Sequence, residues 1–362
     1  MSEIKTARCF RSSNFEFLRI VAMFLIVIHH CMVHGVQHVL SPDLAIRSAW
    51  LSEVGANRML TIFFAPGGAI GVGVFFMISG YFMYEKSPRI KKIVEMLAEV
   101  FFYSFFLLAF FFCIKCSGLY SFPELGKGFS FVLSMLFPVG RTTWWFFTVW
   151  LLLYCMNDSI TALFGKLTEK QYIRFLIIFF IFFIFVGSVL LEPYESIQRG
   201  IFYFLLGRYF RQFPQKQSVC LCSLCAIFWW SVSVCIQFVE MNIAIRYGME
   251  FVVSHRIETV LNGIADGFVA PFCALFLFLS FKNIQIKNHP AVNVLASTTF
   301  GIYLLHASPL GTETLWKVFY TGGGMNNFPL KSFALCFGIF IVCSVVDLFR
   351  QKLFSFVKRR FV

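Results

Sequence analysis

The sequence predicts an all-α fold, a polytopic transmembrane helical bundle of about ten spans with both termini in the cytoplasm. Hydrophobic residues make up 59% of the 362 residues and charged residues only 14%, whereas an ordinary soluble domain has about 25% charged residues. Mean hydropathy is +0.77, and apolar segments recur along the chain without a long polar stretch between them. Water cannot be the solvent for most of such a surface.

The predicted spans follow from the length that a helix needs to cross the hydrocarbon core, about 20 apolar residues. The first apolar segment follows the basic residues Lys5, Arg8 and Arg11 but lacks a small-residue cleavage site, so we expect a retained helix rather than a signal peptide. We expect spans near residues 15–36, 62–84, 93–114, 144–160, 173–191, 197–213, 219–239, 259–280, 296–316 and 332–350.

The basic residues predict the orientation. With the N-terminus inside, the cytoplasmic segments collect about twice as many lysines and arginines as the opposite side, counting Arg208 and Arg350 among them. We expect a cytoplasmic segment over residues 1–14, a transmembrane domain over 15–351 and a basic cytoplasmic tail over 352–362. The net charge of +13 then reflects topology and attraction to anionic membrane lipid rather than nucleic-acid binding.

The twelve cysteines do not indicate a metal or redox site. Cys113 and Cys116, like Cys222 and Cys225, have CxxC spacing, but both pairs lie in or beside apolar runs. Free cysteine in such a run behaves as a small buried hydrophobe. Structural zinc needs four converging ligands, and disulfide frameworks belong to small secreted domains.

Polar residues at membrane depth are functional candidates because they are costly there. Arg19 and His30 in the first span are eleven residues apart, which on a helix is about 20° from the same face and about 16 Å along the axis. His29 is displaced from this stripe by about 80°, so we expect it not to share the role of His30. The alternative is structural: Arg19 snorkels to the interface and His30 bonds a neighbouring helix.

The spacing of His30, His34 and His38 raises the possibility of a metal site. No HExxH motif accompanies them and the series runs out of the membrane, so we expect no metal. Asp266 in the eighth span lies near the depth of His30, and His306 lies near the middle of the ninth span.

Several charged residues have the spacing of pairs within one helix. Glu16 can reach Arg19, and Asp347 can reach Arg350, across a single turn. Glu95 and Glu99 are expected, as structural residues, to pair with lysines about one turn earlier, Lys91 and Lys92.

Five stretches in order resemble landmarks of the acyltransferase-3 family of integral membrane acyltransferases. In the first, Arg19 and His30 are separated by ten residues, as in that family's first helix. The stretches are residues 14–22 continuing to His29 and His30, then 71–81, 144–147, 204–207 and 299–306. Further positions that match the family pattern are Glu16, Ser79, Gly80, Trp145, Tyr303 and His306.

The chain departs from the family pattern at two places. Gly73 stands where many members carry an acidic residue. A pair of basic residues after the second helix falls on Arg89 and Lys92, and lysine lacks the planar fork of arginine. These departures weaken the transfer of family roles to those positions. For Gly71, Gly73 and Gly80 we expect close helix packing.

The resemblance implies transfer of an acyl group, most often acetyl, from cytosolic acyl-coenzyme A to a hydroxyl of a cell-surface glycan or a lipid-linked saccharide at the cell membrane. His30 is then the expected general base, and Asp266 would orient it if the fold brings the two helices together. Arg19, Arg89, Lys91 and Lys92 would bind the phosphorylated donor at the inner mouth.

Two other classes stay open from the sequence. A membrane transporter or flippase could use Arg19, His30 and Asp266 as a polar relay. A structural or sensory membrane protein would need none of these chemical roles. Consumption of acyl-coenzyme A by membranes that contain the protein would distinguish them.

Overall fold

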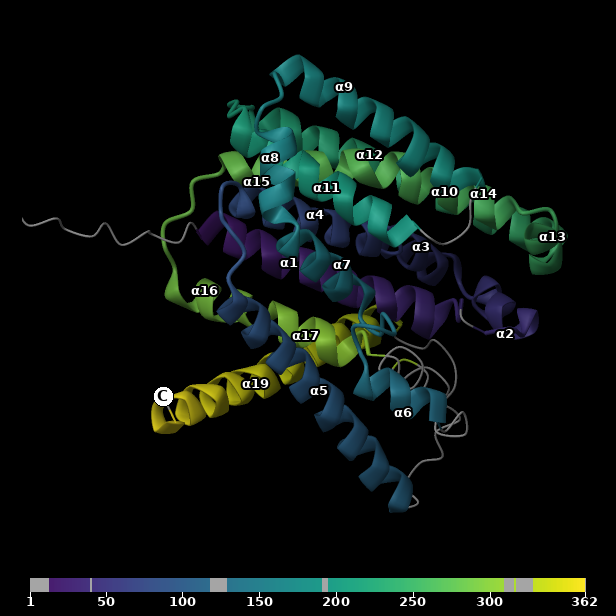
Figure 1. The fold of residues 1–362 in the computed structure, drawn as a ribbon. Coiled ribbons are helices and arrows are strands. Elements are labelled where there is room, and N and C mark those ends of the chain that lie inside the picture. Colours follow the sequence, from purple (N-terminus) through teal and green to yellow (C-terminus); the bar gives the residue numbers. More distant parts are fainter. Residues whose placement is uncertain are drawn as a thin grey trace, which may run out of the picture.

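The computed structural model describes residues 13–39, 41–117, 129–190, 195–308, 316 and 328–361. Every regular element in these ranges is helical, which confirms the predicted all-α fold (Figure 1). The α-helices are α1 (Ser13–His30), α2 (Leu44–Ser48), α3 (Gly55–Phe64), α4 (Gly67–Met83), α5 (Ile90–Cys116), α6 (Phe129–Leu136), α7 (Trp145–Cys155), α8 (Asn157–Phe164), α9 (Glu169–Phe179), α10 (Val186–Leu190), α11 (Glu195–Gln212), α12 (Val219–Tyr247), α13 (Met249–Ser254), α14 (Ile257–Ile264), α15 (Ala270–Asn283), α16 (Pro290–Ser297), α17 (Thr299–His306) and α19 (Phe328–Phe361).

Among the described residues, 7 helical stretches are long and apolar enough to cross a membrane. Helices α7 and α8 pass the same test only together, and they are bent by 60° at their junction, so they add at most one span. The stretches are Ser13–Val36, Gly55–Met83, Ile90–Phe110, Glu169–Val189, Val219–Tyr247, Ile257–Asn283 and Leu330–Arg359. The chain is therefore a multi-pass membrane protein. The seven stretches match seven of the predicted spans, and the bent pair α7–α8 corresponds to the one at 144–160. The spans predicted at 197–213 and 296–316 are not matched.

The two unmatched spans have identifiable causes. Helix α11 covers the first of them but carries Glu195 and three arginines, which lower its hydropathy. The second is broken into α16 and α17 at Thr298, and residues 309–315 fall outside the described ranges. Whether these segments also cross the membrane, as the count of ten requires, stays a prediction.

Helices α4 and α11 touch through their backbones. A methyl group added at Gly80 would lie 1.9 Å from the carbonyl oxygen of Phe204, and one at Gly207 would lie 2.0 Å from that of Met77. Small residues at these positions are therefore required for the contact, as is common between membrane helices. The close packing expected at Gly80 is confirmed, and it fixes α11 beside α4.

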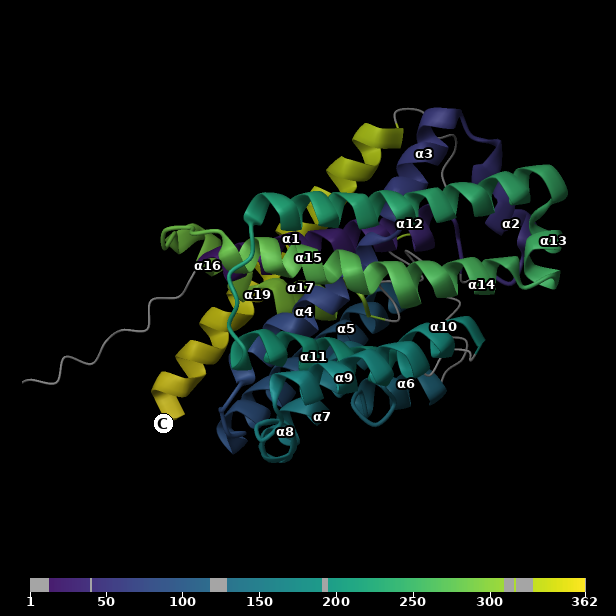
Figure 2. The same cartoon turned by 90° about the horizontal axis from the view of Figure 1, so that it is seen from above.

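The helix ends assigned to the cytoplasm meet at one end of the bundle. Asn14 Nδ2 at the start of α1 donates to the carbonyl of Phe281 near the end of α15, at 2.7 Å. Asn157 Nδ2 in α8 donates to the carbonyl of Met83 at the end of α4, at 2.8 Å. The start of α1 and the end of α19 lie on this same side, at the left of Figures 1 and 2. That these helix ends lie together agrees with the predicted alternation of the spans. That this end of the bundle faces the cytoplasm stays a prediction.

Arg208 has a structural role, although the sequence predicts it to be one of the basic residues on the cytoplasmic side. Its side chain is fully buried. It donates to Asn157 Oδ1 at 3.0 Å and to Thr161 Oγ1 at 2.6 Å, and its guanidinium lies 4.9 Å from the ring centre of Tyr84. Arg208 thereby ties α11 to α8 and to the segment after α4.

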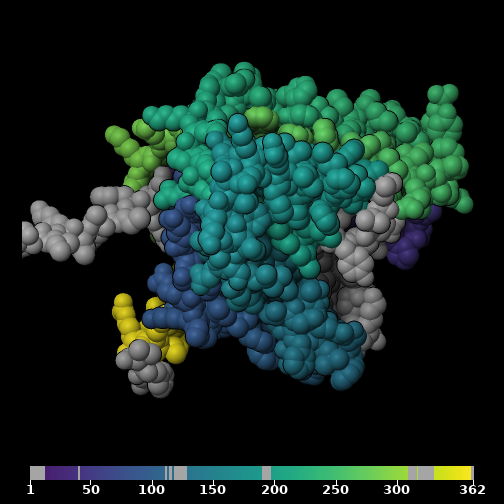
Figure 3. Space-filling model, turned by 45° about the horizontal axis from the view of Figure 1, so that its top comes forward, coloured from purple at the N-terminus to yellow at the C-terminus, as the bar shows by residue number. Residues whose placement is uncertain are grey.

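The outer helices expose apolar side chains. Phe182, in the π-helical segment η4 (Phe180–Phe185), is 63% exposed, and Ile227 in α12 is also 63% exposed. In Figure 3 these teal and green parts of the chain form the upper face of the molecule. Such a surface suits lipid tails and would associate in water.

Two further π-helical segments interrupt spans close to polar residues. Segment η1 (Cys31–Val36) directly follows His30 and carries His34, and η5 (Ala265–Val269) carries Asp266. Single π-turns within α-helices change the direction of side chains and frequently mark functional sites. These interruptions explain why a continuous 3.6-residue period places the polar residues only approximately.

Candidate active site

A cationic cavity of about 740 Å³ lies among α1, α4, α5, α7 and the α16–α17 segment. Ser79, one of the family-motif positions, also faces it, and its hydroxyl donates to the carbonyl of Phe75 at 2.9 Å. The cationic residues that line this cavity are Arg19, Lys86, Arg89, Lys91 and Lys92. All four residues predicted to bind the donor therefore face one cavity.

Arg19 is held by the predicted neighbour on its own helix. Its Nη1 lies 3.2 Å from Glu16 Oε2, an i,i+3 ion pair. The Arg19 side chain keeps 33% of its surface exposed, whereas that of Glu16 keeps 11%. The pair orients the guanidinium at the rim of the cavity and leaves part of it accessible to a ligand.

The acidic residues of α5 do not pair as predicted. Glu95 Oε1 lies 2.6 Å from Lys358 Nζ, and Glu99 Oε1 lies 2.9 Å from Arg350 Nη2. Within the described part of the chain no ion pair joins either glutamate to Lys91 or Lys92. The prediction is wrong because α19 brings two other cations, Lys358 and Arg350, within ion-pair distance of the glutamates. Lys91 and Lys92 remain on the cavity wall.

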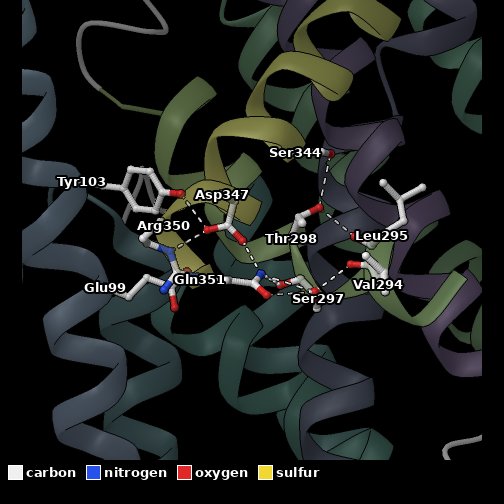
Figure 4. A network of polar contacts seen from close by, with 10 residues as sticks. All are labelled: Glu99, Tyr103, Val294, Leu295, Ser297, Thr298, Ser344, Asp347, Arg350 and Gln351. Carbon is white, nitrogen blue, oxygen red and sulfur yellow. Dashed lines mark hydrogen bonds and ion pairs between the residues drawn. The ribbon is translucent and has the colours of Figure 1, made fainter. Parts of the chain in front are cut away.

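A buried polar network behind this cavity joins α5 to α19 (Figure 4). The predicted pair of Asp347 and Arg350 is confirmed, with 2.7 Å between Oδ1 and Nε. Tyr103 donates to the same carboxylate oxygen at 2.6 Å, and Gln351 Nε2 donates to the other oxygen at 2.7 Å. Asp347 is therefore fully buried and has partners on both oxygens.

The same network positions α17. A methyl group added at Gly301 would lie 2.2 Å from Asp347 Oδ1, so α17 packs directly on this carboxylate. Thr298, at the break before α17, donates to Ser344 Oγ at 3.2 Å. On the other side, Trp144 Nε1 donates to the carbonyl of Leu304 at 3.1 Å. Helix α17 is thus fixed between α19 and the start of α7.

A second cavity, of about 330 Å³, lies deeper in the bundle. It is bounded by α1 with η1, α4, α7, α11, η5 and α17, and the predicted site residues His30, Asp266, Trp145 and Tyr303 all line it. The other polar residues on its wall are His29, His34, Thr143, Arg199 and Tyr203. The fold therefore brings the first and eighth predicted spans together around one space.

His30 is the centre of a histidine cluster. Its ring centroid lies 5.1 Å from that of His34 and 5.1 Å from that of His306. His306 Nδ1 donates to the carbonyl of Ile302 at 2.6 Å, since a carbonyl can only accept. His306 Nε2 is then the lone-pair nitrogen. In the described structure, His30 Nδ1 and His306 Nε2 are buried without a hydrogen-bond partner.

His29 is closer to this site than predicted. It lines the same cavity as His30, although its ring packs directly against Gly68 of α4. Its Nδ1, however, bonds the carbonyl of Ala65. His29 therefore borders the cavity while one nitrogen is committed to the backbone.

The histidines show no metal-site geometry. Over the described ranges, no group of three or more His, Cys, Asp or Glu side chains is placed to hold a metal ion. His38, the third member of the predicted series, follows η1 in a left-handed conformation with φ 49°, and it is not on the wall of the second cavity.

Asp266 has a partner that the sequence did not suggest. Its Oδ2 lies 3.6 Å from Arg199 Nη1, and Arg199 Nη2 donates to Ser188 at 3.2 Å. The ion-pair partner of Asp266 is therefore Arg199 rather than a histidine. The available signal for Arg199 in the sequence was its position at the start of the sixth predicted span, 197–213.

The two cavities share one wall. Met23 of α1, Phe75 of α4, Phe146 of α7 and Tyr303 of α17 line both of them. The cationic cavity thus lies on one side of these four side chains and the histidine cavity on the other. A reactant that extends from the first cavity past this wall would reach the space beside His30.

The comparisons with known proteins agree with this arrangement. A family model described as an acyltransferase domain, of the acyltransferase-3 family, matches residues 12–348. A search of curated proteins and a search of solved structures found no match. Because the matched range takes in both cavities and nearly the whole chain, the protein belongs to the acyltransferase-3 family of membrane acyltransferases.

Proposed function

We propose that the protein is a membrane O-acyltransferase, which moves an acyl group, acetyl in the first instance, from cytosolic acyl-coenzyme A to a hydroxyl of a cell-surface glycan or a lipid-linked saccharide. The observation that carries this proposal is the pair of cavities divided by four side chains. A donor and an acceptor can then approach a single point from opposite sides, which is the geometry a transfer reaction needs.

The first cavity suits the donor. Coenzyme A carries phosphates, and guanidinium and ammonium groups bind phosphate through charge-assisted hydrogen bonds. Arg19, Arg89, Lys91 and Lys92 supply four such groups in the lining of this cavity. The apolar surface around Met23 and Phe75 then suits the pantetheine arm and its acyl end, which would point toward the shared wall.

The second cavity suits the acceptor and the base. His30 would take the proton of the acceptor hydroxyl, whose oxygen forms a bond to the thioester carbonyl carbon. The carbon–sulfur bond then breaks, and the coenzyme A thiolate leaves and recovers a proton. Asp266 lines the same cavity, and its charge would stabilise the imidazolium through space. This modifies the expectation that it holds the ring directly.

The proposal includes the membrane setting. We place the protein in the cell membrane with ten crossings, of which α11 and the α16–α17 segment would supply two, and with residues 1 and 362 in the cytoplasm. Membrane lipid would contact the apolar outer helices. This orientation puts the cationic cavity where acyl-coenzyme A is available.

Membranes from cells that do or do not produce the protein, supplied with acetyl-labelled acetyl-coenzyme A, test the proposal. The expected result is label in the glycan or lipid-saccharide fraction that mild alkali releases, because O-esters are alkali-labile and N-acetyl groups are not. Equal alkali-labile label in both membrane preparations would contradict it. A transporter would instead move the donor or the saccharide intact, without release of coenzyme A.

A further inference from the structure

The wall between the two cavities contains a single strong hydrogen-bond donor. Of its members, Met23, Phe75 and Phe146 have no O–H or N–H in their side chains, whereas Tyr303 has a hydroxyl. In the proposed reaction this wall is where the thioester carbonyl and the acceptor oxygen meet. A donor at that point is placed for the charge that develops on the carbonyl oxygen.

Tyr303 is held in place from several directions. Its side chain is buried, with 8% of its surface exposed, and its ring packs edge-on against Phe146 at 5.5 Å between centroids. The helix that carries it is fixed by the contact of Gly301 with Asp347 and by the bond from Trp144 to Leu304. The hydroxyl is therefore pre-positioned, which is what electrostatic catalysis requires.

The Tyr303 side chain faces the same space as the proposed base. Tyr303 and His30 both line the second cavity, and three residues further along α17 His306 stands beside His30. A phenol carries one O–H donor, which can be given to an oxyanion at this point.

The chemistry needs such a group. When the acceptor oxygen bonds to the thioester carbon, the carbonyl π electrons move to its oxygen, and the resulting oxyanion needs a hydrogen-bond donor that is not also the base. His30 is occupied with the acceptor proton, and the cations of the first cavity are occupied with phosphate.

We infer that the Tyr303 hydroxyl is the oxyanion donor of the transfer step, a catalytic residue in addition to His30. This inference rests on the proposed function. Tyr303 donates a hydrogen bond without losing its proton. When the carbonyl re-forms, the carbon–sulfur bond breaks and the thiolate leaves, while the proton taken by His30 is passed on to it or to water.

The test is Tyr303→Phe, which keeps the ring and removes only the hydroxyl, measured with acetyl-coenzyme A and the full-length protein in native membranes. We expect kcat to fall about 100-fold or more, as for other single oxyanion donors, with the donor KM changed less than about threefold. The matched control is Tyr172→Phe. Tyr172 is also buried and donates to the Leu205 carbonyl at 3.0 Å, but it lines neither cavity and should keep wild-type kcat.

The outcomes separate the two proposals. Wild-type kcat in Tyr303→Phe, or a loss that appears only in the donor KM, overturns the oxyanion role. Absence of acyl transfer in the wild-type protein overturns the proposed function instead. If Tyr303→Phe does not fold, difluorotyrosine at position 303 keeps the shape and lowers the phenol pKa. Activity should then be lost at a lower pH than in the wild type, and an unchanged pH profile would contradict the inference.

Discussion

The imidazole rings of His30 in α1 and His306 in α17 lie 5.1 Å apart, centroid to centroid, although the two residues are 276 positions apart in the chain. His306 Nδ1 donates to the Ile302 carbonyl, so its Nε2 is the acceptor nitrogen, and this nitrogen is buried without a hydrogen-bond partner in the described structure. This contact joins the first and ninth predicted spans and places a second histidine beside the proposed base. His306 was a family-motif position without an assigned role, and the contact gives it one candidate role, the orientation of His30.

We expect His30→Ala to reduce acyl transfer by at least about 100-fold, since it removes the general base. His29→Ala should retain most activity because one nitrogen of His29 is committed to the Ala65 carbonyl. Initial rates at matched membrane levels of the two variants measure this. A His30 variant with near-normal turnover would remove the general-base assignment.

His306→Ala should lower kcat about tenfold, which corresponds to about 1.4 kcal/mol, through loss of the contact that orients His30. In a His30→Ala background the same change should cause no further loss, because the ring that it orients is absent. Single and double variants compared for residual turnover decide this. Independent, multiplicative losses would show that His306 acts elsewhere.

Arg19→Lys keeps the charge but loses the planar fork. We expect the apparent KM for acetyl-coenzyme A to rise about tenfold, about 1.4 kcal/mol of donor binding. Arg141→Lys is the control, since Arg141 bonds Ser130 at 2.9 Å and lines neither cavity. Donor titrations at saturating acceptor give the values. If lysine substitutes freely at position 19, Arg19 serves only as an interfacial anchor.

Arg350→Met should destabilise the protein by about 3–5 kcal/mol, because it leaves the buried Asp347 and Glu99 without their cation. Lys358→Met breaks the more exposed pair with Glu95 and should change stability by less than about 1 kcal/mol. Thermal unfolding in detergent compares them. Equal shifts in the two variants would mean that the network does not hold α19 to α5.

Part of this site could be read from the sequence because it depends on short-range geometry. The pair of Glu16 and Arg19 follows from helix periodicity alone, and so does the placement of Arg19 and His30 at two depths of one helix. Hydropathy located the spans that are apolar throughout. Helix α11 does not pass the same test because its three arginines lower its hydropathy. Arg199 and Arg208 are instead satisfied by side chains on other helices.

The remainder depends on tertiary contacts that no local pattern contains. Arg208 and Arg350 look like loop cations in sequence, yet both are buried among partners on other helices. The partner of Asp266 is Arg199, which lies 67 positions earlier in the chain. The shared wall that includes Tyr303 exists only once four helices are assembled.

Reporter fusions at residues 1 and 362 test the predicted orientation. We expect both reporters in the cytoplasm, because basic residues concentrate on that side and because the start of α1 and the end of α19 lie at one end of the bundle (Figure 1). Reporters in opposite compartments would contradict an even number of crossings. They would also remove the basis for placing the cationic cavity on the cytoplasmic side, where acyl-coenzyme A is available.

The central claim, that donor and acceptor meet across the shared wall, is tested most directly with doubly labelled acetyl-coenzyme A. The protein is reconstituted in sealed vesicles with a saccharide-lipid extract, and acetyl and adenine carry different labels. We predict that the acetyl label moves to the acceptor in alkali-labile form while the adenine label stays, as free coenzyme A, on the side of the cationic cavity. Both labels crossing together would indicate transport, and an intact donor in the presence of its acceptor would contradict the transfer reaction.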